Sequence, residues 1–291
     1  MRIAYYASIA AALLMFASGC HKEKDNVVAG ADKKITLRPT IATQTEARMQ
    51  TRAPQLNGIG SGNFSDGDTF TLYTTSASGQ TTSLSYTVGE GKLYWKDVMF
   101  AEQDKSVDFA ACYPECEVVG GKFTFDLETA SDTDLLWAHT KGVAVWTEAP
   151  VELAFEHVMH SLVFNFSTNS DEIALDQIKT ECTAKSTCEV DLANGAIDNS
   201  SSRKATFSQT GAKAVFRIVP QRSSDVAIKI SAGESEKTFN LSDVVSEHDN
   251  LEGGKILTVN LTVKDGKITV DGSSIVGWGD QGSVDDEIIL Y

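Results

Sequence analysis

Apolar and polar residues alternate with a period of two along most of the chain beyond residue 60. This alternation places every second side chain on one face of a half-buried β-strand. The apolar positions that define the expected strands are Phe70/Leu72, Leu84/Tyr86/Val88, Leu93/Trp95, Val107/Phe109/Ala111, Phe123/Phe125/Leu127, Val143/Val145, Val151/Leu153/Phe155, Leu162/Phe164/Phe166, Val226/Ile228/Ile230 and Leu257/Val259/Leu261/Val263. The pattern predicts an all-β protein.

Glycine-containing turns separate these segments and predict how neighbouring strands pair. Gly89-Glu90-Gly91-Lys92 is expected to join the two strands that flank it as a hairpin. Lys264-Asp265-Gly266-Lys267 leads from one alternating run into Ile268 and Val270, and Asp-Gly between alternating runs is the strongest short hairpin signal. The second hairpin is the more strongly indicated of the two.

The length of 291 residues predicts two domains. Helical periodicity is confined to residues 171–178 and 241–248, and neither stretch is long enough to form a helical layer. Many short strands separated by turns favour stacked antiparallel sheets. We therefore expect two β-sandwiches in tandem, an N-terminal one at residues 53–149 and a C-terminal one at residues 150–291.

The N-terminus has the features of a secretory signal peptide over residues 1–19. Arg2 precedes an uncharged, largely apolar stretch that ends in Ala17-Ser18-Gly19-Cys20. Small residues before this cysteine resemble a bacterial lipobox, in which the Cys20 thiol is acylated, for example with palmitate; the alternative is a plain signal peptide with an incidental cysteine. Acyl chains anchor a protein without a transmembrane helix. Since His21 rather than Asp follows Cys20, we expect the outer membrane or the cell surface.

Residues 20–52 form a basic segment ahead of an acidic body. They carry seven Lys or Arg and four Asp or Glu, whereas the whole chain has a net charge of -15. So acidic a protein repels phosphate backbones, which makes nucleic acid a poor partner. Ile35, Leu37 and Ile41 alternate around Pro39, a pattern typical of an edge strand. We expect a tether and a strand in this segment, which ends at Arg52.

No motif of the sequence predicts catalysis. Glu156-His157-Val158-Met159-His160 shares residue types with a zinc-protease helix, but its histidines are three residues apart and the segment is expected to be extended. Residues 58–62 match only a fragment of a phosphate loop, and residues 63–68 lack the ligands of a calcium loop. We therefore expect no enzyme activity, no cofactor and no metal.

Cysteine and tryptophan positions leave two further alternatives open. The pairs Cys112 with Cys116 and Cys182 with Cys188 each flank a turn, so local disulfides are favoured over metal binding in an exported protein. The tryptophans form either a sugar-binding surface or parts of the core. They are Trp95, Trp137, Trp146 and Trp278.

The order of several short motifs resembles the fimbrillin family, the type V pilus subunits of Bacteroides-like bacteria. The motifs follow the lipobox and extend over essentially the whole chain. They are Thr51-Arg52-Ala53, Phe64-x2-Gly67-Asp68, Tyr94-Trp95-Lys96-Asp97, Asp134-Leu135-Leu136-Trp137-Ala138, Leu153-x-Phe155-x-His157, Val219-Pro220-Gln221 and Ile275-x2-Trp278. The resemblance implies two transthyretin-like β-sandwich domains and export as a lipoprotein.

The resemblance also implies an assembly mechanism. A trypsin-like, Arg-specific protease would cut between Arg52 and Ala53, with Arg48 as a fallback site, and remove the leader strand. A strand from another fimbrial subunit would then fill the exposed groove by β-augmentation. Ile288-Ile289-Leu290-Tyr291 is a candidate short strand, and stalk, tip and anchor roles stay open.

The alternative function is a glycan-binding lipoprotein of the cell surface. Two observations distinguish the hypotheses: a pilus subunit should bury residues 35–41 as a strand, whereas a glycan binder should expose at least two tryptophans in one patch.

Overall fold

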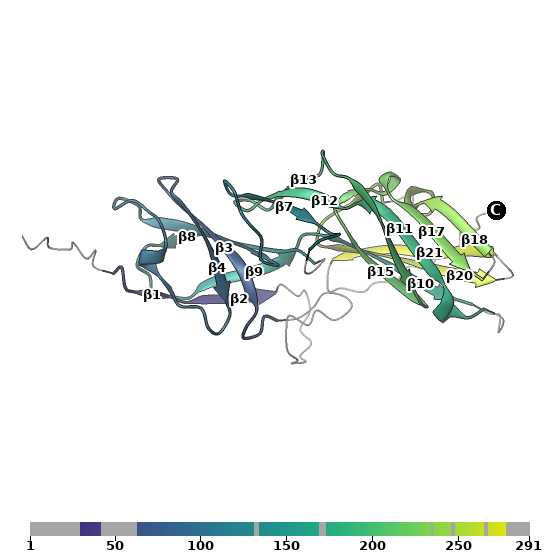
Figure 1. The fold of residues 1–291 in the computed structure, drawn as a ribbon, viewed down its shortest axis with the longest axis horizontal. Coiled ribbons are helices and arrows are strands. Elements are labelled where there is room, and N and C mark those ends of the chain that lie inside the picture. Colours follow the sequence, from purple (N-terminus) through teal and green to yellow (C-terminus); the bar gives the residue numbers. More distant parts are fainter. Residues whose placement is uncertain are drawn as a thin grey trace, which may run out of the picture.

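The computed structural model describes residues 30–41, 63–130, 134–168, 173–233, 235–245, 248–264 and 267–277. These residues form β-strands and a few short 3-10 turns, with no α-helix in this part of the chain. The strands gather into two lobes along the long axis of the molecule (Figure 1). The all-β prediction is confirmed.

The first lobe is built on a six-stranded sheet in the order β2-β9-β8-β6-β3-β4. The strands are β2 (Leu37–Ile41), β3 (Thr69–Ser76), β4 (Thr81–Thr87), β6 (Ser106–Tyr113), β8 (Leu136–Ala144) and β9 (Val151–His157). Neighbours run antiparallel except β2 and β9, which are parallel. The short strands β1 (Lys34–Ile35) and β5 (Leu93–Tyr94) pair beside this sheet, and the 3-10 turn η1 (Trp95–Asp97) follows β5.

Alternation along these strands produces the core of the first lobe. Phe70 and Leu72 pack in one buried cluster, whereas Tyr73, on the opposite face of the strand, packs in another. Both faces of the central strand β3 are therefore covered. The expected hairpin at Gly89–Lys92 is wrong, because β4 pairs with β3 and β5 pairs with β1.

The second lobe consists of two four-stranded sheets. One has the order β15-β10-β20-β21, formed by β10 (His160–Ser167), β15 (Lys213–Ile218), β20 (Lys255–Lys264) and β21 (Lys267–Gly277). The other has the order β14-β11-β17-β18, formed by β11 (Lys179–Lys185), β14 (Lys204–Thr210), β17 (Ala227–Ala232) and β18 (Ser235–Asn240). Their inner faces enclose a single apolar core, so this lobe is a β-sandwich.

The connections of the second lobe agree in part with the sequence patterns. Lys264 pairs with Lys267 where β20 and β21 meet, which confirms the expected hairpin; its two turn residues lie outside the described residues. In the described parts of the two expected helical stretches, the helical structure is limited to the 3-10 turns η2 (Leu175–Gln177) and η4 (Leu241–Asp243). A third such turn, η3 (Ser223–Asp225), follows β16 (Gln221–Arg222), which pairs with β19 (Asn250–Leu251).

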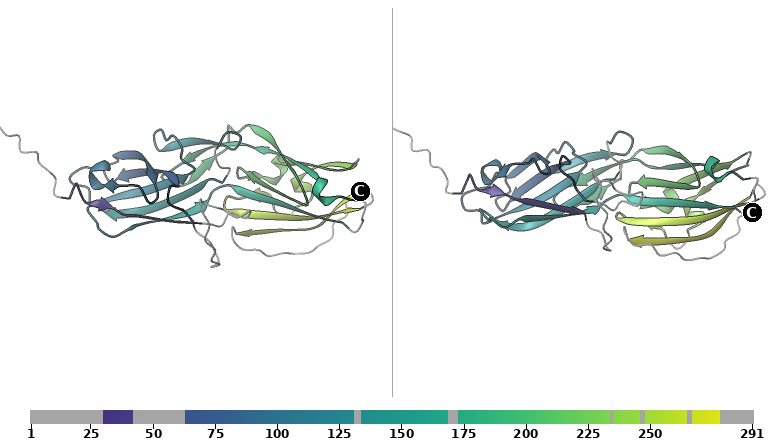
Figure 2. Two further views of the ribbon diagram at one scale, coloured as in Figure 1. Left: turned by 60° about the horizontal axis from the view of Figure 1, so that its bottom comes forward. Right: turned by 90° about the horizontal axis from the view of Figure 1, so that it is seen from below.

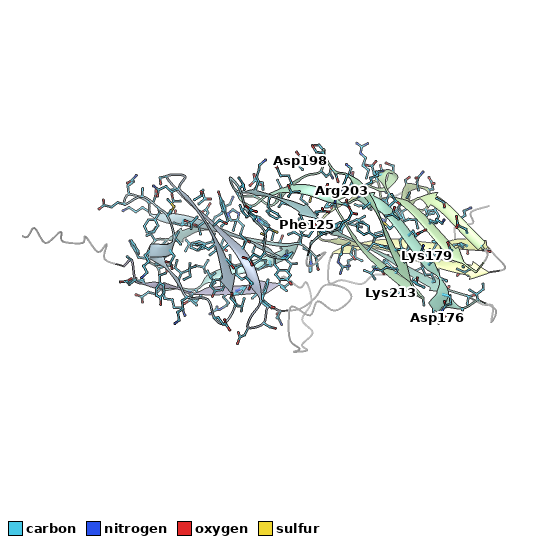
Figure 3. The ribbon with its side chains drawn as sticks, viewed as in Figure 1. Phe125, Asp176, Lys179, Asp198, Arg203 and Lys213 are labelled. Carbon is cyan, nitrogen blue, oxygen red and sulfur yellow. The ribbon has the colours of Figure 1, made fainter. Side chains whose placement is uncertain are left out.

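A three-stranded sheet joins the lobes. Its strands are β7 (Lys122–Asp126), β12 (Thr187–Asp191) and β13 (Ala196–Asp198), and β7 pairs with β12 across the junction. Phe125 and Arg203 are both labelled at this junction in Figure 3, and Arg203 contacts Asp126 and Glu128 at 2.7 and 2.8 Å. The lobes therefore share backbone pairing, a buried cluster and ion pairs.

The strand pairings cross the domain boundary expected between residues 149 and 150. Strand β9 follows that boundary but lies in the sheet of the first lobe. The chain enters the second lobe only at β10. Whether the two lobes are independent domains stays a prediction.

Candidate functional site

The residues expected to form a leader strand lie along the edge of the first lobe. β1 and β2 run lengthwise from the outer end of this lobe toward the second lobe, as the purple segment shows in Figures 1 and 2. We call β1 and β2 together the leader strand. β2 stands at the end of its sheet, and among the described strands β9 is its one neighbour there.

The leader strand changes partner halfway along its length. At β1, Lys34 and Ile35 pair antiparallel with Tyr94 and Leu93. The Val151 amide then donates to the Thr36 carbonyl at 2.8 Å, and β2 continues parallel to β9. The leader strand thereby bridges β5 and β9.

Three side chains of the leader strand belong to the core of the first lobe. Ile35, Leu37 and Ile41 are only 2, 8 and 5% exposed and pack with the apolar residues of β9, among others. Burial of such a side chain stabilises a fold by about 1.5–3 kcal/mol. The prediction that residues 35–41 are buried as a strand is confirmed. We call the surface that these three side chains cover, together with the paired edges of β5 and β9, the groove.

Pro39 is compatible with this position because the strand lies at an edge. It stands opposite Leu153 in the parallel register of β2 and β9. Proline has no backbone N–H to donate, and it is tolerated on an edge strand where no second neighbour needs that donor. The sequence pattern around Pro39 therefore identified the correct location.

Ion pairs fix the charged side chains of the leader to the rim of the groove. Lys33 contacts Glu148 at 2.9 Å, and Arg38 contacts Glu152 at 2.6 Å. The hydrogen bond and charge of Lys33 lower the pKa of Glu148 below its ordinary value. These side chains are 43–78% exposed, so the pairs contribute more to register than to stability.

In a third ion pair at the rim, the leader contributes the anion and the body of the lobe contributes the cation. Asp32 contacts Lys96 at 2.8 Å, and this hydrogen bond raises the pKa of Lys96 above its ordinary value. The Lys96 amide also donates to the Ala31 carbonyl at 2.9 Å. No local sequence pattern indicates the rim residues Lys96, Glu148 and Glu152, because each is far from its partner along the chain.

An aromatic cluster holds the beginning of the described leader. Gly30 has a φ of +110°, and a Cβ atom there would lie 2.9 Å from the Trp146 ring. Trp146 packs edge-on against Trp95 with ring centroids 6.0 Å apart. A side chain at position 30 would collide with the Trp146 ring, so only glycine fits there.

The described tryptophans have structural partners. Trp95 is fully buried, and its indole donates to the Thr147 carbonyl at 3.3 Å. Trp137 donates to the Leu192 carbonyl at 2.9 Å, and Trp137 and Trp146 are partly buried against apolar clusters. Trp278 lies outside the described residues. The three described tryptophans thus do not form the exposed patch expected of a glycan binder.

The four described cysteines carry free thiols. Cys112 and Cys116 lie close enough for a thiol–thiol hydrogen bond, which together with burial raises the pKa of Cys112. The same bond lowers the pKa of Cys116. The structure brings this expected pair together without joining it, and a disulfide here stays a prediction.

The second expected pair is separated. The Cys182 side chain enters the core of the second lobe, whereas Cys188 enters the cluster at the junction. Burial raises the pKa of each thiol to about 12. The structure therefore does not bring this expected pair together, because the two side chains pack in different clusters, and a disulfide between them stays a prediction.

The two histidines of the rejected zinc motif are structural. His157 on β9 is buried and contacts Asp134 at 3.0 Å. His160 on β10 is fully buried, with Nδ1 2.8 Å from the Glu252 carbonyl. Within the described ranges, no three metal-ligating side chains come together. In the same part of the chain, no helix is long and apolar enough to cross a bilayer.

The expected lipidation and processing residues lie outside the described residues. These are Cys20, Arg52 and Ala53. The described chain stops at Ile41 and resumes at residue 63, so the expected cleavage site lies between the leader strand and the body of the first lobe.

The sequence profile of a family described as fimbrillin-like matches residues 51–278. No curated protein matches the sequence significantly.

Solved structures from Bacteroides and Parabacteroides species share the fold. A candidate cell-adhesion protein of Bacteroides uniformis has a TM-score of 0.62 and 15% identity, over 85% of this chain and 98% of that chain. One of Bacteroides ovatus has a TM-score of 0.58 and 17% identity, over 88% and 100%. A fimbrial assembly protein of Parabacteroides distasonis has a TM-score of 0.50 and 8% identity, over 87% and 99%. At these identities the likeness shows the fold, and the profile match over most of the sequence shows that the chain belongs to the fimbrillin-like family.

Proposed function

We propose that this protein is a non-catalytic fimbrial subunit whose leader, residues 20–52, is a temporary occupant of the groove. An Arg-specific protease cuts after Arg52, the leader departs, and a strand of another fimbrial subunit takes its place. A tip or accessory adhesive role is slightly favoured over a stalk role. Membership of the fimbrillin-like family and the name of the Parabacteroides distasonis relative support this assignment.

One observation carries the proposal: the leader strand belongs to the core but lies at the edge. Ile35, Leu37 and Ile41 are buried, yet β2 has β9 as its single neighbour in the sheet. Departure of the leader strand breaks its own pairs, β1 with β5 and β2 with β9, and leaves the other strand pairs of the six-stranded sheet in place. After cleavage in the connection between residues 41 and 63, noncovalent contacts alone would retain the leader.

Departure of the leader exposes a surface that favours binding of a replacement strand. The N–H and C=O groups of β9 that now pair with β2 become unpaired, and the apolar surface under three side chains becomes exposed. Such an edge binds an extended segment through backbone hydrogen bonds and side-chain pockets. Proteolytic removal of the leader thereby exposes the site that binds a strand of the next subunit.

Export delivers the subunit to the protease and to its partners. The signal peptide and the acylated Cys20 direct the protein to the outer membrane, where the lipid holds it until cleavage releases the body. We further infer that both lobes are transthyretin-like sandwiches. The two facing sheets of the second lobe support this for residues beyond β9.

The experiment is controlled cleavage of the full chain. A trypsin-like protease should convert the monomer into a species that enters fibres with the cognate subunits, as followed by size-exclusion chromatography and electron microscopy. Arg52→Ala should delay the conversion, and adding Arg48→Ala should block it. Cleaved protein that joins no fibre, alone or with those subunits, contradicts the proposal and favours the glycan-binding alternative.

A further inference from the structure

We propose that the groove selects its replacement strand by charge: it accepts a strand with basic flanks from a different subunit and disfavours residues 285–291 of a second copy of this chain. The inference rests on the proposed function, because it concerns the groove after the leader has left. The partner strand is expected to carry basic residues beside its apolar positions.

Two carboxylates on the rim of the groove have cationic partners on the leader. Lys33 is 2.9 Å from Glu148, and Arg38 is 2.6 Å from Glu152. Among the ion pairs of the described residues, neither carboxylate has a second cation. When the leader departs, these two carboxylates lose their counter-charges, and Lys96 loses Asp32, so the vacated rim carries two negative charges and one positive charge.

The leader strand provides the template for what fits. Its apolar side chains occupy positions 35, 37 and 41 along a strand parallel to β9. One cation stands two residues before the first apolar position, and the other stands one residue after the second. A replacement that reproduces this pattern fills the core and neutralises Glu148 and Glu152 together.

The candidate strand of this chain has the opposite charge. Ile288-Ile289-Leu290-Tyr291 follows Asp285-Asp286-Glu287 directly. Placing Ile288 and Leu290 at positions 35 and 37 puts Asp286 at position 33, where it faces Glu148.

The alternative register gives the same conflict. With Ile289 and Tyr291 at positions 35 and 37, Glu287 takes position 33. Either register thus replaces the Lys33–Glu148 attraction by repulsion. Either register also puts an aspartate at position 32, where it can pair with Lys96 as Asp32 does, so the conflict is confined to the carboxylates. The net charge of -15 opposes the approach of a second copy as well. Like-charge contacts of this kind are a common means of rejecting wrong partners.

The rim charges are exposed, so the expected discrimination is moderate and depends on salt. Exposed pairs contribute little individually and are screened as the Debye length shortens from about 10 Å at 0.1 M to about 3 Å at 1 M ionic strength. We expect roughly 3- to 10-fold weaker binding for a strand with both flanking charges reversed at low salt. At 1 M salt the difference should disappear.

The test uses the full chain cleaved after Arg52 and synthetic peptides of equal length. A labelled peptide of residues 30–41 is exchanged into the groove, and unlabelled competitors displace it. The competitors are the same peptide, its Lys33→Glu/Arg38→Glu form, and residues 280–291. The native peptide should compete best at low salt, and the other two should be weaker.

Matched single changes separate rim charge from total charge. Arg38→Glu should weaken the peptide more than Lys34→Glu, because Lys34 is exposed and makes no ion pair among the described contacts. In cleaved protein carrying Glu152→Lys, the order should invert, so that the Arg38→Glu peptide binds better than the native one.

The outcomes distinguish the two proposals. If no peptide of residues 30–41 enters the groove, the leader is not replaceable, and both the proposed function and this inference fail. If the native and charge-reversed peptides bind equally at low salt, in the native and the Glu152→Lys protein alike, strand replacement stands and charge selection is wrong. Tighter binding of residues 280–291 than of residues 30–41 would also overturn the inference.

Discussion

At the scale of single residues, Ile35 and Leu37 link the leader to the stability of the first lobe. Both side chains are almost fully buried in the cluster that also contains Leu153 and Phe155 of β9. Arg38 and Thr40, on the other face of β2, are exposed. The leader strand therefore contributes both buried apolar side chains and backbone hydrogen bonds to the first lobe.

Shortening a buried side chain of the leader strand should destabilise the intact subunit. Leu37→Ala is expected to lower the free energy of unfolding by about 2–5 kcal/mol, because it removes buried methyl groups and leaves a cavity. Thr40→Ala, an exposed change in the same strand, is the control and should have little effect. Urea unfolding followed by tryptophan fluorescence measures both. Equal losses for the two variants would show that the strand acts through its backbone alone.

His160 should make stability depend on pH. Burial lowers its pKa from 6.5 to about 4, although its hydrogen bond to the Glu252 carbonyl acts in the other direction. Between these values the unfolded chain binds a proton that the folded chain does not, so stability falls as pH drops from about 6.5 to about 4.

The expected loss is about 3.5 kcal/mol at most, since the shift is about 2.5 pKa units and each unit corresponds to about 1.4 kcal/mol. Denaturant unfolding across this pH range measures it. His160→Gln should remove this part of the slope, and an unchanged slope in that variant would refute the assignment.

At the scale of elements, the pairing of β7 with β12 makes the lobes interdependent. Phe125 of β7 is 2% exposed and packs in the junction cluster with Cys188 and Val190 of β12. Arg203 adds ion pairs to Asp126 and Glu128, but it lies at the surface. Apolar packing rather than charge should therefore hold the junction together.

Two variants compare these contributions. Phe125→Ala is expected to destabilise the protein by about 3–5 kcal/mol and to separate the unfolding of the lobes into two transitions. Arg203→Ala should leave the unfolding curve nearly unchanged, because exposed ion pairs are screened. Calorimetry resolves the transitions. A single transition for Phe125→Ala with an unchanged midpoint would mean that the junction does not couple the lobes.

The alternating pattern was enough to predict most strands and the edge location of the leader, because burial of one face leaves a period of two in the sequence. It failed where partners are distant. The expected Gly89–Lys92 hairpin did not form because β5 pairs with the leader strand. Likewise, Arg38 and Glu152 are 114 residues apart, so their ion pair has no local signal. The separation of Cys182 from Cys188 follows from which core each strand faces, which spacing alone does not specify.

At the scale of the whole molecule, the proposed function would place lipid anchoring and removal of the leader in one sequence of events. Acylation at Cys20 would hold the unprocessed subunit through the same segment that cleavage removes. Release from the membrane and opening of the groove would then be a single step.

The anchor has a direct test. Cys20→Ala should abolish labelling by a fatty-acid analogue and release the protein from the membrane fraction, because no thiol remains to be acylated at the lipobox. Cys116→Ala, a cysteine change elsewhere, should keep both properties. Persistent labelling of the Cys20 variant would show that the lipid is attached at another residue or that the lipobox prediction is wrong.

The N-terminus of the protein within surface fibres measures most directly whether the leader is removed on assembly. Mass spectrometry of fibres sheared from the cell surface should find a new N-terminus at Ala53 and no peptide from residues 30–41. Fibres that contain the subunit with residues 30–41 still attached would contradict the removal of the leader strand and, with it, the assembly mechanism.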